Sequence, residues 1–347
     1  MKTIRDFDIK NKRVLVRCDF NVPLNLEGDI LDDFKIVQTL PTINYLVKKK
    51  AKVILMSHLG DPRGKAVKRL KLDGIKTRLE KYLKVKIKKL NNCFGNEVKK
   101  SLETIKGGEI VLLENLRFHF QEEKGNLDFA KKLGSLAEIF VNDAFASSHR
   151  GHASFRVAKF LPSAAGLLLE KEIRILTKLR NHPKKPLVVI LGGQPKGIEI
   201  KLKLINQITV QAIVLLANLV ADELEKKSLK LDRPEKVIFP VDSVDGFDIG
   251  PQTLQVFREK ISQAKTVFWS GPLGKIEEKK YSHGSLQVAR AIIKSRAFSV
   301  AGGGETTWFL NNLGLADKFN HLSTGGDALL VFLSGEKLPG LEMLHNP

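Results

Sequence analysis

The sequence predicts an α/β protein made of two domains, each built on a parallel β-sheet. Its 347 residues exceed the roughly 250 to 300 residues at which a single core usually stops growing. Short apolar runs rich in β-branched residues recur between longer stretches of helical spacing, which is typical of buried parallel strands in βαβ units. The clearest runs are 13–18, 52–57, 109–115, 138–143, 186–193, 212–218, 236–241, 266–271 and 298–304.

The boundary between the two domains is expected near the middle of the chain. About half of the apolar runs precede Pro162 and half follow Pro186. Between them, Glu170–Arg180 has helical apolar spacing and a charged opposite face, which predicts an interdomain helix. We therefore place an N-terminal domain at 1–168, the interdomain helix at 169–184, a C-terminal domain at 185–332 and a tail at 333–347.

Composition favours a cytoplasmic protein without a membrane span. Hydrophobic residues make up 43% of the chain, but no apolar run reaches the roughly 18 residues that a spanning helix needs. The first 20 residues carry charges throughout and lack the apolar segment of a secretory signal. Cys18 and Cys93, a distant pair in a long chain, are expected to be reduced thiols.

The formal net charge of +20 raises the possibility of nucleic-acid binding, because lysine and arginine neutralise phosphates. The lysines, however, are scattered along expected helix surfaces, as in Lys81–Leu90, without interleaved aromatic residues. We interpret them as a solvated basic surface and expect no nucleic-acid partner. The electrostatic field of this positive charge would attract any anionic substrate.

Glycine-rich loops follow several predicted strands of the second half. In open parallel sheets, ligands bind at the carboxyl ends of strands, where helix N-termini favour anions. One such loop can be only a tight turn, but four in one domain favour a phosphate-bearing ligand. The loops contain Gly192 and Gly193, Gly271 and Gly274, Gly302 to Gly304, and Ser323 to Gly326, the last before an expected helix.

The first half instead places arginines and histidines at its predicted strand ends. The arginines are Arg17, Arg117 and Arg150, and the histidines are His58, His149 and His152. Guanidinium groups bind carboxylate and phosphate through two parallel hydrogen bonds, so this group suits a small phosphorylated acid. The two halves together suggest phosphoryl transfer across a cleft, with hinge closure that excludes water.

Motifs along the whole chain resemble those of the phosphoglycerate kinase family, in the same order. They are RCDFNVP from Arg17, MSHLG from Met56, LLENLRFH from Leu112, VNDAF and SHRGHAS within 141–154, then LPSAAG, SGPLG, AGGGET and NHLSTGG. The resemblance implies two Rossmann-like domains joined by a helix and hinge, with the tail packed near the hinge. It also implies a monomer that exchanges a phosphoryl group between 1,3-bisphosphoglycerate and ADP, with Mg²⁺ carried by the nucleotide.

The resemblance assigns the binding of 3-phosphoglycerate to the N-terminal domain. Lys35 stands where the family has an arginine that stabilises the transferring phosphoryl group, and it keeps the charge but not the planar fork. Asp61 replaces another family arginine, and Arg63, two positions on, is a candidate to compensate. The residues that match the family's substrate ligands are Arg17, Asp19, Asn21, His58, Arg117 and Arg150.

The nucleotide side departs further from the family pattern. Lys196 and Lys201 are the nearest candidates for the catalytic lysines, but Pro195 changes their loop. Leu215–Leu219 replaces a glycine triplet beside the adenine, and Asp327 replaces a phosphate-loop glycine, where its charge would oppose the nucleotide. The candidate nucleotide ligands are Gly193, Glu277, Gly302, Gly303, Gly304, Glu305 and Thr324, with Glu305 as the metal ligand.

Three functions therefore remain open from the sequence. The first is an active phosphoglycerate kinase with an unusual nucleotide pocket, and the second is a weak or inactive relative that acts as a binding protein. The third is a nucleic-acid-associated protein that uses the same fold. Intact substrate-side arginines favour the first or a binding role, whereas the clustered nucleotide-side changes favour the second.

Overall fold

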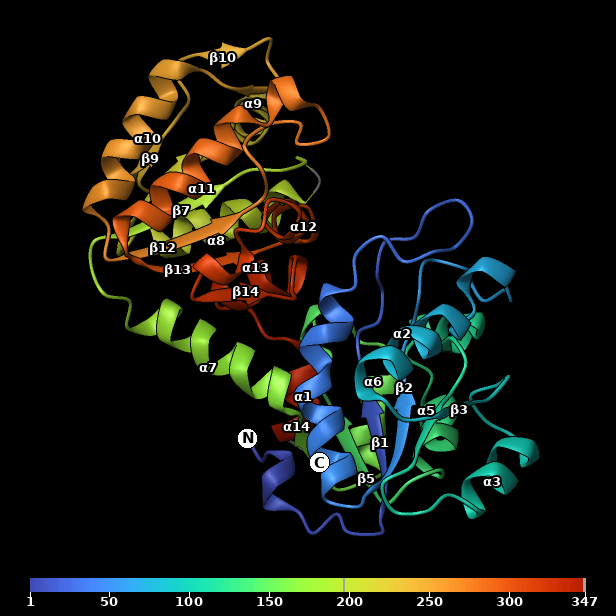
Figure 1. Cartoon of the computed structure of the whole chain (residues 1–347). Coiled ribbons are helices and arrows are strands. Elements are labelled where there is room, and N and C mark those ends of the chain that lie inside the picture. The colour runs from blue at the N-terminus through green and yellow to red at the C-terminus, as the bar shows by residue number, and fades with distance from the viewer. Residues whose placement is uncertain (196, 346–347) are drawn as a thin grey trace. The chain divides into compact units, whose positions relative to one another are not determined.

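A computed structural model gives the fold, and it describes residues 1–195 and 197–345 (Figure 1). The chain divides into two compact units, of which the second is the continuous segment Arg174–Glu336. Unit 1 contains Met1–Ile173 together with the chain from Lys337 onward. Each unit is built on a six-stranded sheet whose strands all pair in parallel, which confirms the predicted α/β class.

Unit 1 has the strand order β3-β4-β2-β1-β5-β6. Its strands are β1 (Arg13–Arg17), β2 (Lys52–Met56), β3 (Ile87–Lys89), β4 (Ile110–Leu112), β5 (Ile139–Asn142) and β6 (Ser163–Ala165). Its helices are α1 (Phe34–Lys48), α2 (Asp73–Leu83), α3 (Asn96–Glu103), α4 (Phe120–Glu123), α5 (Leu127–Gly134), α6 (Ala153–Arg156) and α14 (Pro339–His345). Helix α7 (Leu167–Asn181) contains the boundary between the units.

Unit 2 has the strand order β14-β13-β12-β7-β8-β9. Its sheet strands are β7 (Leu187–Leu191), β8 (Ala212–Leu216), β9 (Val237–Ile238), β12 (Thr266–Ser270), β13 (Phe298–Gly302) and β14 (His321–Ser323). A separate hairpin pairs β10 (Ser243–Val244) with β11 (Asp248–Ile249). Its helices are α8 (Ile198–Ile208), α9 (Asn218–Lys226), α10 (Pro251–Gln263), α11 (His283–Ser295), α12 (Gly304–Asn312) and α13 (Asp327–Leu333).

All nine predicted apolar runs contain a strand, and the predicted helix at 170–180 lies within α7. One sequence interpretation is wrong in part, because Lys81–Leu90 is not a continuous helix surface. Helix α2 ends at Leu83, Lys84 has a left-handed backbone with φ of 56°, and the chain then forms β3. Among the described residues, no helix combines the length and the apolar character needed to cross a bilayer.

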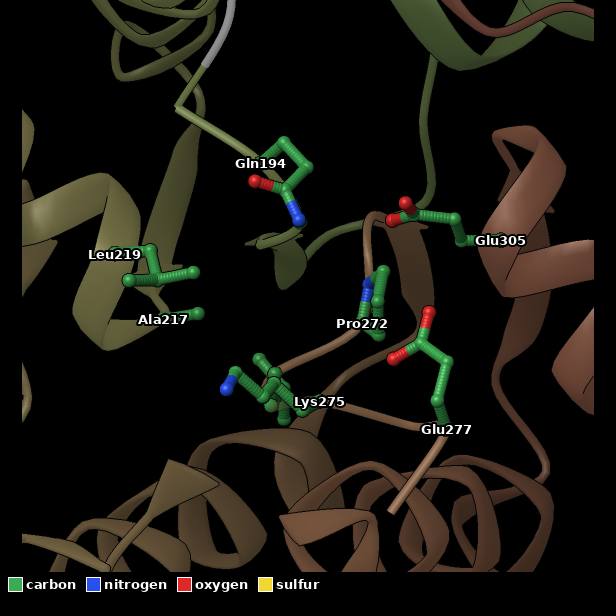
Figure 2. Close-up of a pocket in the computed structure, with 10 residues that line it drawn as sticks. Gln194, Ala217, Leu219, Pro272, Lys275, Glu277 and Glu305 are labelled. Carbon is green, nitrogen blue, oxygen red and sulfur yellow. The ribbon is translucent and has the colours of Figure 1, made fainter. Parts of the chain in front are cut away.

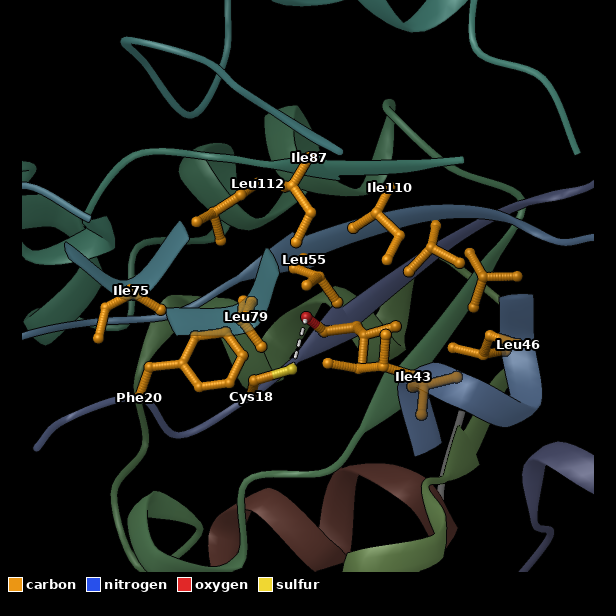
Figure 3. Packing of buried hydrophobic residues seen from close by; sticks show 14 of the residues in the cluster. Cys18, Phe20, Ile43, Leu46, Leu55, Ile75, Leu79, Ile87, Ile110 and Leu112 are labelled. Atoms are coloured by element: carbon orange, nitrogen blue, oxygen red, sulfur yellow. Dashed lines mark hydrogen bonds between the residues drawn. The ribbon is translucent and has the colours of Figure 1, made fainter. Parts of the chain in front are cut away.

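The core of unit 1 forms where apolar side chains from the sheet meet those of the neighbouring helices (Figure 3). Leu55 of β2 and Ile110 of β4 lie in the same buried cluster as Ile43 of α1 and Leu79 of α2. Cys18 is fully buried in this cluster, and its thiol points back to the carbonyl of Val16 at 3.9 Å. Burial of continuous apolar strands on both faces is what a parallel sheet requires.

Candidate active site

The carboxyl ends of three neighbouring strands bring Arg17, His58 and Arg117 to one edge of the sheet in unit 1. Arg17 ends β1 and lies in register with Met56 of β2, so His58 follows on the next strand at the same edge. The Nη2 atom of Arg17 is 3.0 Å from Nδ1 of His58, and both side chains are buried. Because arginine is a donor only, Nδ1 accepts this bond, and the neutral ring carries its proton on Nε2.

His58 is neutral at physiological pH. Burial lowers its pKa well below the usual value. The nearby positive charges of Arg17, Arg117 and Lys35 lower this pKa further, whereas the negative charge of Asp19 raises it. Its Nε2–H is therefore a neutral hydrogen-bond donor at the sheet edge.

Asp19 organises a second group of predicted residues at the same edge. Its Oδ1 accepts from Nζ of Lys35 at 3.2 Å and from the backbone N–H of Asn21 at 3.1 Å. Burial would raise the pKa of Asp19, but the charges of Lys35 and Arg17 and the hydrogen bond from the Asn21 N–H outweigh it and hold that pKa well below its usual range. The Asn21 Oδ1 atom accepts the N–H of Gly60 at 2.8 Å, which ties this loop to the one after β2.

Arg117 lies in the short helical turn after β4 and adds another positive charge. Its Nη1 donates to the carbonyl of Gly60 at 2.8 Å, and its Nε is 3.4 Å from a carboxylate oxygen of Glu123. Burial lowers its pKa, opposed by Glu123, and the positive charge of Arg150 lowers it further. Arg150 is exposed, so of the predicted arginines it is the one with the freest access to a ligand in solution.

Asp61 and Arg63 form a pair of their own. Arg63 Nε is 3.7 Å from Asp61 Oδ2, and both side chains are largely exposed. The candidate compensating charge of Arg63 is therefore directed at Asp61 itself. The pair brings no net charge to the place where the family pattern has an arginine.

The structure adds two residues that sequence reasoning did not select, Glu122 and Ser154. Glu122 is fully buried and accepts the backbone N–H of Ser154 at 2.9 Å and its hydroxyl at 2.6 Å. Ser154 Oγ in turn accepts Nε of Arg17 at 2.9 Å. Glu122 stands within LRFHFQEE, but nothing in that spacing marks which of its two glutamates turns inward.

Three of the nucleotide-side candidates, Gly193, Glu277 and Glu305, line a pocket in unit 2 (Figure 2). Figure 2 shows Glu277 and Glu305 on one side of this pocket and Ala217 and Leu219 on the other. Leu219, which belongs to the segment predicted to place bulky side chains beside the adenine, lines this pocket. Lys275, which sequence reasoning passed over, also lines the pocket, and its Nζ lies 3.6 Å from the centre of the Phe247 ring.

Close backbone approach explains the glycines in the loops after β7 and β12. A Cβ atom on Gly192 would lie 2.1 Å from the carbonyl oxygen of Pro272, and one on Gly271 would lie 2.2 Å from the backbone of Gly192. Gly271 and Gly193 also have positive φ values of 85° and 73°. Only glycine fits this contact between the ends of β7 and β12.

Lys201 is turned toward the backbone of its own loop. Its Nζ donates to the carbonyls of Gly192 at 2.9 Å and Gln194 at 2.6 Å. Burial lowers the pKa of Lys201 to about 8, although the carboxylates of Glu305 and Asp327 oppose the shift. The ammonium group of Lys201 thus stabilises the loop after β7. Lys196, the other predicted catalytic lysine, lies outside the described residues.

The remaining predicted nucleotide residues lie at the carboxyl ends of β13 and β14. Gly302 ends β13, Gly303 precedes α12 with φ of 95°, and Gly304 and Glu305 begin that helix. The N–H of Gly303 donates to the carbonyl of Gly325 at 3.2 Å, which joins the two loops. Thr324 is buried, whereas Asp327 is exposed at the first position of α13.

Glu305, the predicted metal ligand, lies near a second carboxylate, that of Glu277. Burial raises the pKa of Glu305, and the negative charge of Glu277 raises it further, against the opposite effect of Lys201. Two such carboxylates favour a divalent cation between them and a phosphate. The described residues contain no cluster of three or more histidine, cysteine, aspartate or glutamate side chains arranged to bind a metal.

Comparison with known proteins gives matches along the whole chain. A sequence model of the family described as phosphoglycerate kinase matches residues 4–218 and 196–336. The phosphoglycerate kinase of Dictyoglomus turgidum is 40% identical over 390 residues, which cover 99% of this chain and 98% of the relative. That of Coprothermobacter proteolyticus is 39% identical over 391 residues with the same coverage. Both alignments are longer than this chain, so the relatives contain segments that it lacks.

Solved structures agree. The crystal structure of phosphoglycerate kinase from Pyrococcus horikoshii OT3 matches with a TM-score of 0.88 and 30% identity, over 99% of this chain and 98% of that one. The structure of the enzyme from Coxiella burnetii matches with a TM-score of 0.80 and 31% identity, with the same coverage.

Proposed function

The chain belongs to the phosphoglycerate kinase family, and we propose that it catalyses reversible phosphoryl transfer between 1,3-bisphosphoglycerate and ADP, giving 3-phosphoglycerate and ATP in glycolysis. The observation that carries this proposal is that two hydrogen-bonded pairs, Arg17 with His58 and Lys35 with Asp19, lie close enough at one sheet edge for their charges to interact. We propose the domain bounds expected from the sequence, a substrate domain at 1–168, a helix at 169–184, a nucleotide domain at 185–332 and a tail at 333–347, of which the part from Lys337 onward groups with unit 1.

The proposed substrate site works mainly through charge and position. Arg117 and Arg150 supply positive charge for the phosphate and carboxylate of 3-phosphoglycerate, and His58 offers a neutral Nε2–H. Lys35, held by Asp19, supplies the positive charge nearest to the transferring group. In phosphoryl transfer the protein contributes chiefly positioning and electrostatic stabilisation, so these groups suffice without a covalent intermediate.

On the nucleotide side, the pocket that Gly193, Glu277 and Glu305 line would take ADP or ATP with Mg²⁺. Glu305 would hold the ion, which neutralises charge on the phosphates when it is bound. Closure of the two domains about the linking helix would then exclude water from the reaction. We further propose a monomeric cytoplasmic enzyme that acts on small molecules and not on nucleic acid.

Addition of 3-phosphoglycerate should raise the melting temperature of the protein, because a ligand that binds only the folded state stabilises it by mass action. At a ligand concentration about 100 times the dissociation constant, the gain is about 2.7 kcal/mol. Thermal scans with millimolar 3-phosphoglycerate test this, and Arg150→Ala should lose most of the shift. Arg290→Ala, which removes an exposed arginine of unit 2, is the matched control and should keep it. The absence of a shift in the wild type would count against the site.

A second candidate function is a slow or inactive relative that binds phosphoglycerate without efficient transfer. Two observations favour it. The Nζ of Lys201 is occupied by two backbone carbonyls, and the exposed Arg63 is paired with Asp61. A coupled assay of ATP formation separates the two functions, since the active enzyme should turn over at roughly the 1 to 100 s⁻¹ typical of kinases.

Replacing Asp327 by asparagine should tighten ATP binding about fivefold. Asp327 is exposed at the start of α13, so its repulsion of a phosphate is screened by water and amounts to roughly 1 kcal/mol. Titration calorimetry with ATP and Mg²⁺ measures the change. Asp222→Asn, an exposed aspartate on α9, should leave the affinity unaltered. Equal affinities of Asp327→Asn and the wild type would show that this carboxylate does not face the nucleotide.

A further inference from the structure

Glu122 is a buried carboxylate that lies behind the proposed phosphoglycerate site. Its side chain is completely inaccessible to solvent, as is that of Arg17 beside it. Such a residue is either a structural ion-pair partner or a group that acts through its neighbours. Its bonding pattern decides between these roles.

The two oxygens of Glu122 hold one residue from both sides. Oε2 accepts the backbone N–H of Ser154, and Oε1 accepts the Ser154 hydroxyl at 2.6 Å. A hydroxyl that donates to a carboxylate has its lone pairs left for a donor, and Nε of Arg17 occupies one of them at 2.9 Å. The serine is thus a relay between the carboxylate and the guanidinium.

The remaining nitrogens of Arg17 have fixed partners as well. Nη1 donates to the carbonyl of Cys18, and Nη2 meets Nδ1 of His58 at 3.0 Å. Nη2 is also 4.0 Å from Oε1 of Glu122, which is close enough for charge attraction but too long for a hydrogen bond. The serine relay is thus one of three contacts that hold the guanidinium in the orientation in which Nη2 meets Nδ1 of His58.

The same carboxylate reaches the segment that carries Arg150. Glu122 Oε1 is 3.8 Å from Nδ1 of His152, and the N–H bond from Ser154 anchors the first turn of α6. Burial and the charges of Arg17, Arg117 and Arg150 lower the pKa of His152 to about 3, so this contact involves a neutral ring. Arg150 lies two residues before His152, on the loop that this anchor holds.

We propose that Glu122, acting through Ser154, is the positioning residue of the phosphoglycerate site. It sets the orientation of Arg17 and His58 from one side and the start of the Arg150 loop from the other. This inference rests on the proposed function, because it concerns how tightly that same site binds its acid substrate.

Two variants test the relay. In Glu122→Gln, one of the two acceptor oxygens becomes an NH₂ donor, which opposes a donor of Ser154. In Ser154→Ala, the hydroxyl is lost while the backbone N–H to Glu122 is kept, so this variant should fold even where Glu122→Gln does not. Each should raise the KM for 3-phosphoglycerate at least tenfold and leave the KM for ATP unchanged. Because the two residues act as one unit, the KM of the double variant for 3-phosphoglycerate should be no higher than that of the more strongly affected single variant.

The control is Glu138→Gln, the same chemical change at a half-exposed glutamate of unit 1, and it should leave both KM values unchanged. A merely structural role predicts lower melting temperatures with unaltered KM values measured well below them, and that result would overturn the proposal. If the wild type neither binds nor phosphorylates 3-phosphoglycerate, the proposed function fails. If the wild type does both and the two relay variants match it, only the role of Glu122 fails.

Discussion

Replacement of Arg17 by methionine is expected to lower the free energy of unfolding of unit 1 by about 3 to 5 kcal/mol. The guanidinium is completely buried between Ser154, His58 and the carbonyl of Cys18. Methionine fills much of the volume but leaves the carboxylate of Glu122 buried without its counter-charge, and breaking a buried pair in this way costs about that amount.

The matched control is Arg13→Met on the same strand. Arg13 is 37% exposed and lies 3.7 Å from Glu138, so its loss should cost about 0 to 1 kcal/mol. Urea unfolding followed by circular dichroism measures both variants. Tryptophan fluorescence would not serve, because Trp269 and Trp308 both lie in unit 2. Equal decreases in the free energy of unfolding in the two variants would show that the buried Arg17 contributes no more to stability than the exposed Arg13.

Replacement of Asp143 by asparagine should produce a gain in stability that grows with pH. Asp143 follows β5, and its Oδ1 accepts the backbone N–H groups of Leu168 and Leu169 at the start of α7, at 3.0 and 3.2 Å. Its Oδ2 is buried without a hydrogen-bond partner among the described residues. Burial raises the pKa of Asp143 to about 7, so the carboxyl is protonated in the folded protein over most of the acidic range.

The sign follows from proton linkage. Between about pH 4 and 7 the folded state holds a proton on Asp143 that the unfolded state has lost, so this group's contribution to stability falls as pH rises, by about 1.4 kcal/mol per pH unit. Buried His58 and His152 have lowered pKa values and change stability in the opposite direction below about pH 6.5. The informative quantity is therefore the difference in free energy of unfolding between Asp143→Asn and the wild type, in which the contributions of the two histidines cancel.

That difference should increase from about pH 5 to 7 and level off above about pH 7, as measured by denaturant unfolding across the range. The side-chain oxygen of the introduced asparagine can still accept the two N–H groups of α7, so the helix start is kept. Asp128→Asn, at an exposed position in the first turn of α5, is the control and should differ from the wild type by a constant amount. A constant difference for Asp143→Asn as well would show that its carboxyl is ionised throughout.

Nine of the sheet strands could be predicted from the sequence because burial on two faces leaves continuous apolar runs. Three sheet strands were not predicted, because none of them contains a continuous apolar run. β3, β6 and β14 are three residues long, with the sequences IKK, SAA and HLS. Each lies at the end of its sheet, where one neighbouring strand supplies the pairing and little apolar character is needed.

The candidate site was predictable as residue types but not as contacts. Arg17 and His58 could be placed at one edge because parallel strands end together. The inward turn of Glu122 depends on Ser154, 32 residues later, and no local pattern links the two. The direction of Lys201 is likewise settled by the backbone carbonyls of Gly192 and Gln194, which the chain sequence alone does not place.

The last helix of the chain, α14, belongs to unit 1 although unit 2 separates it from the rest of that unit. The N–H of Gly340 donates to the carbonyl of Ser148 at 2.8 Å, and the Gly340 carbonyl accepts from Asn142 at 3.0 Å. A ribosome makes most of unit 1 first but delivers α14 only after the whole of unit 2, which is one continuous segment. Domains generally fold as units in their order of synthesis. Here the first-made domain lacks α14 until unit 2 has been synthesised, so the loop that carries Arg150 gains its contacts with Gly340 only after that point.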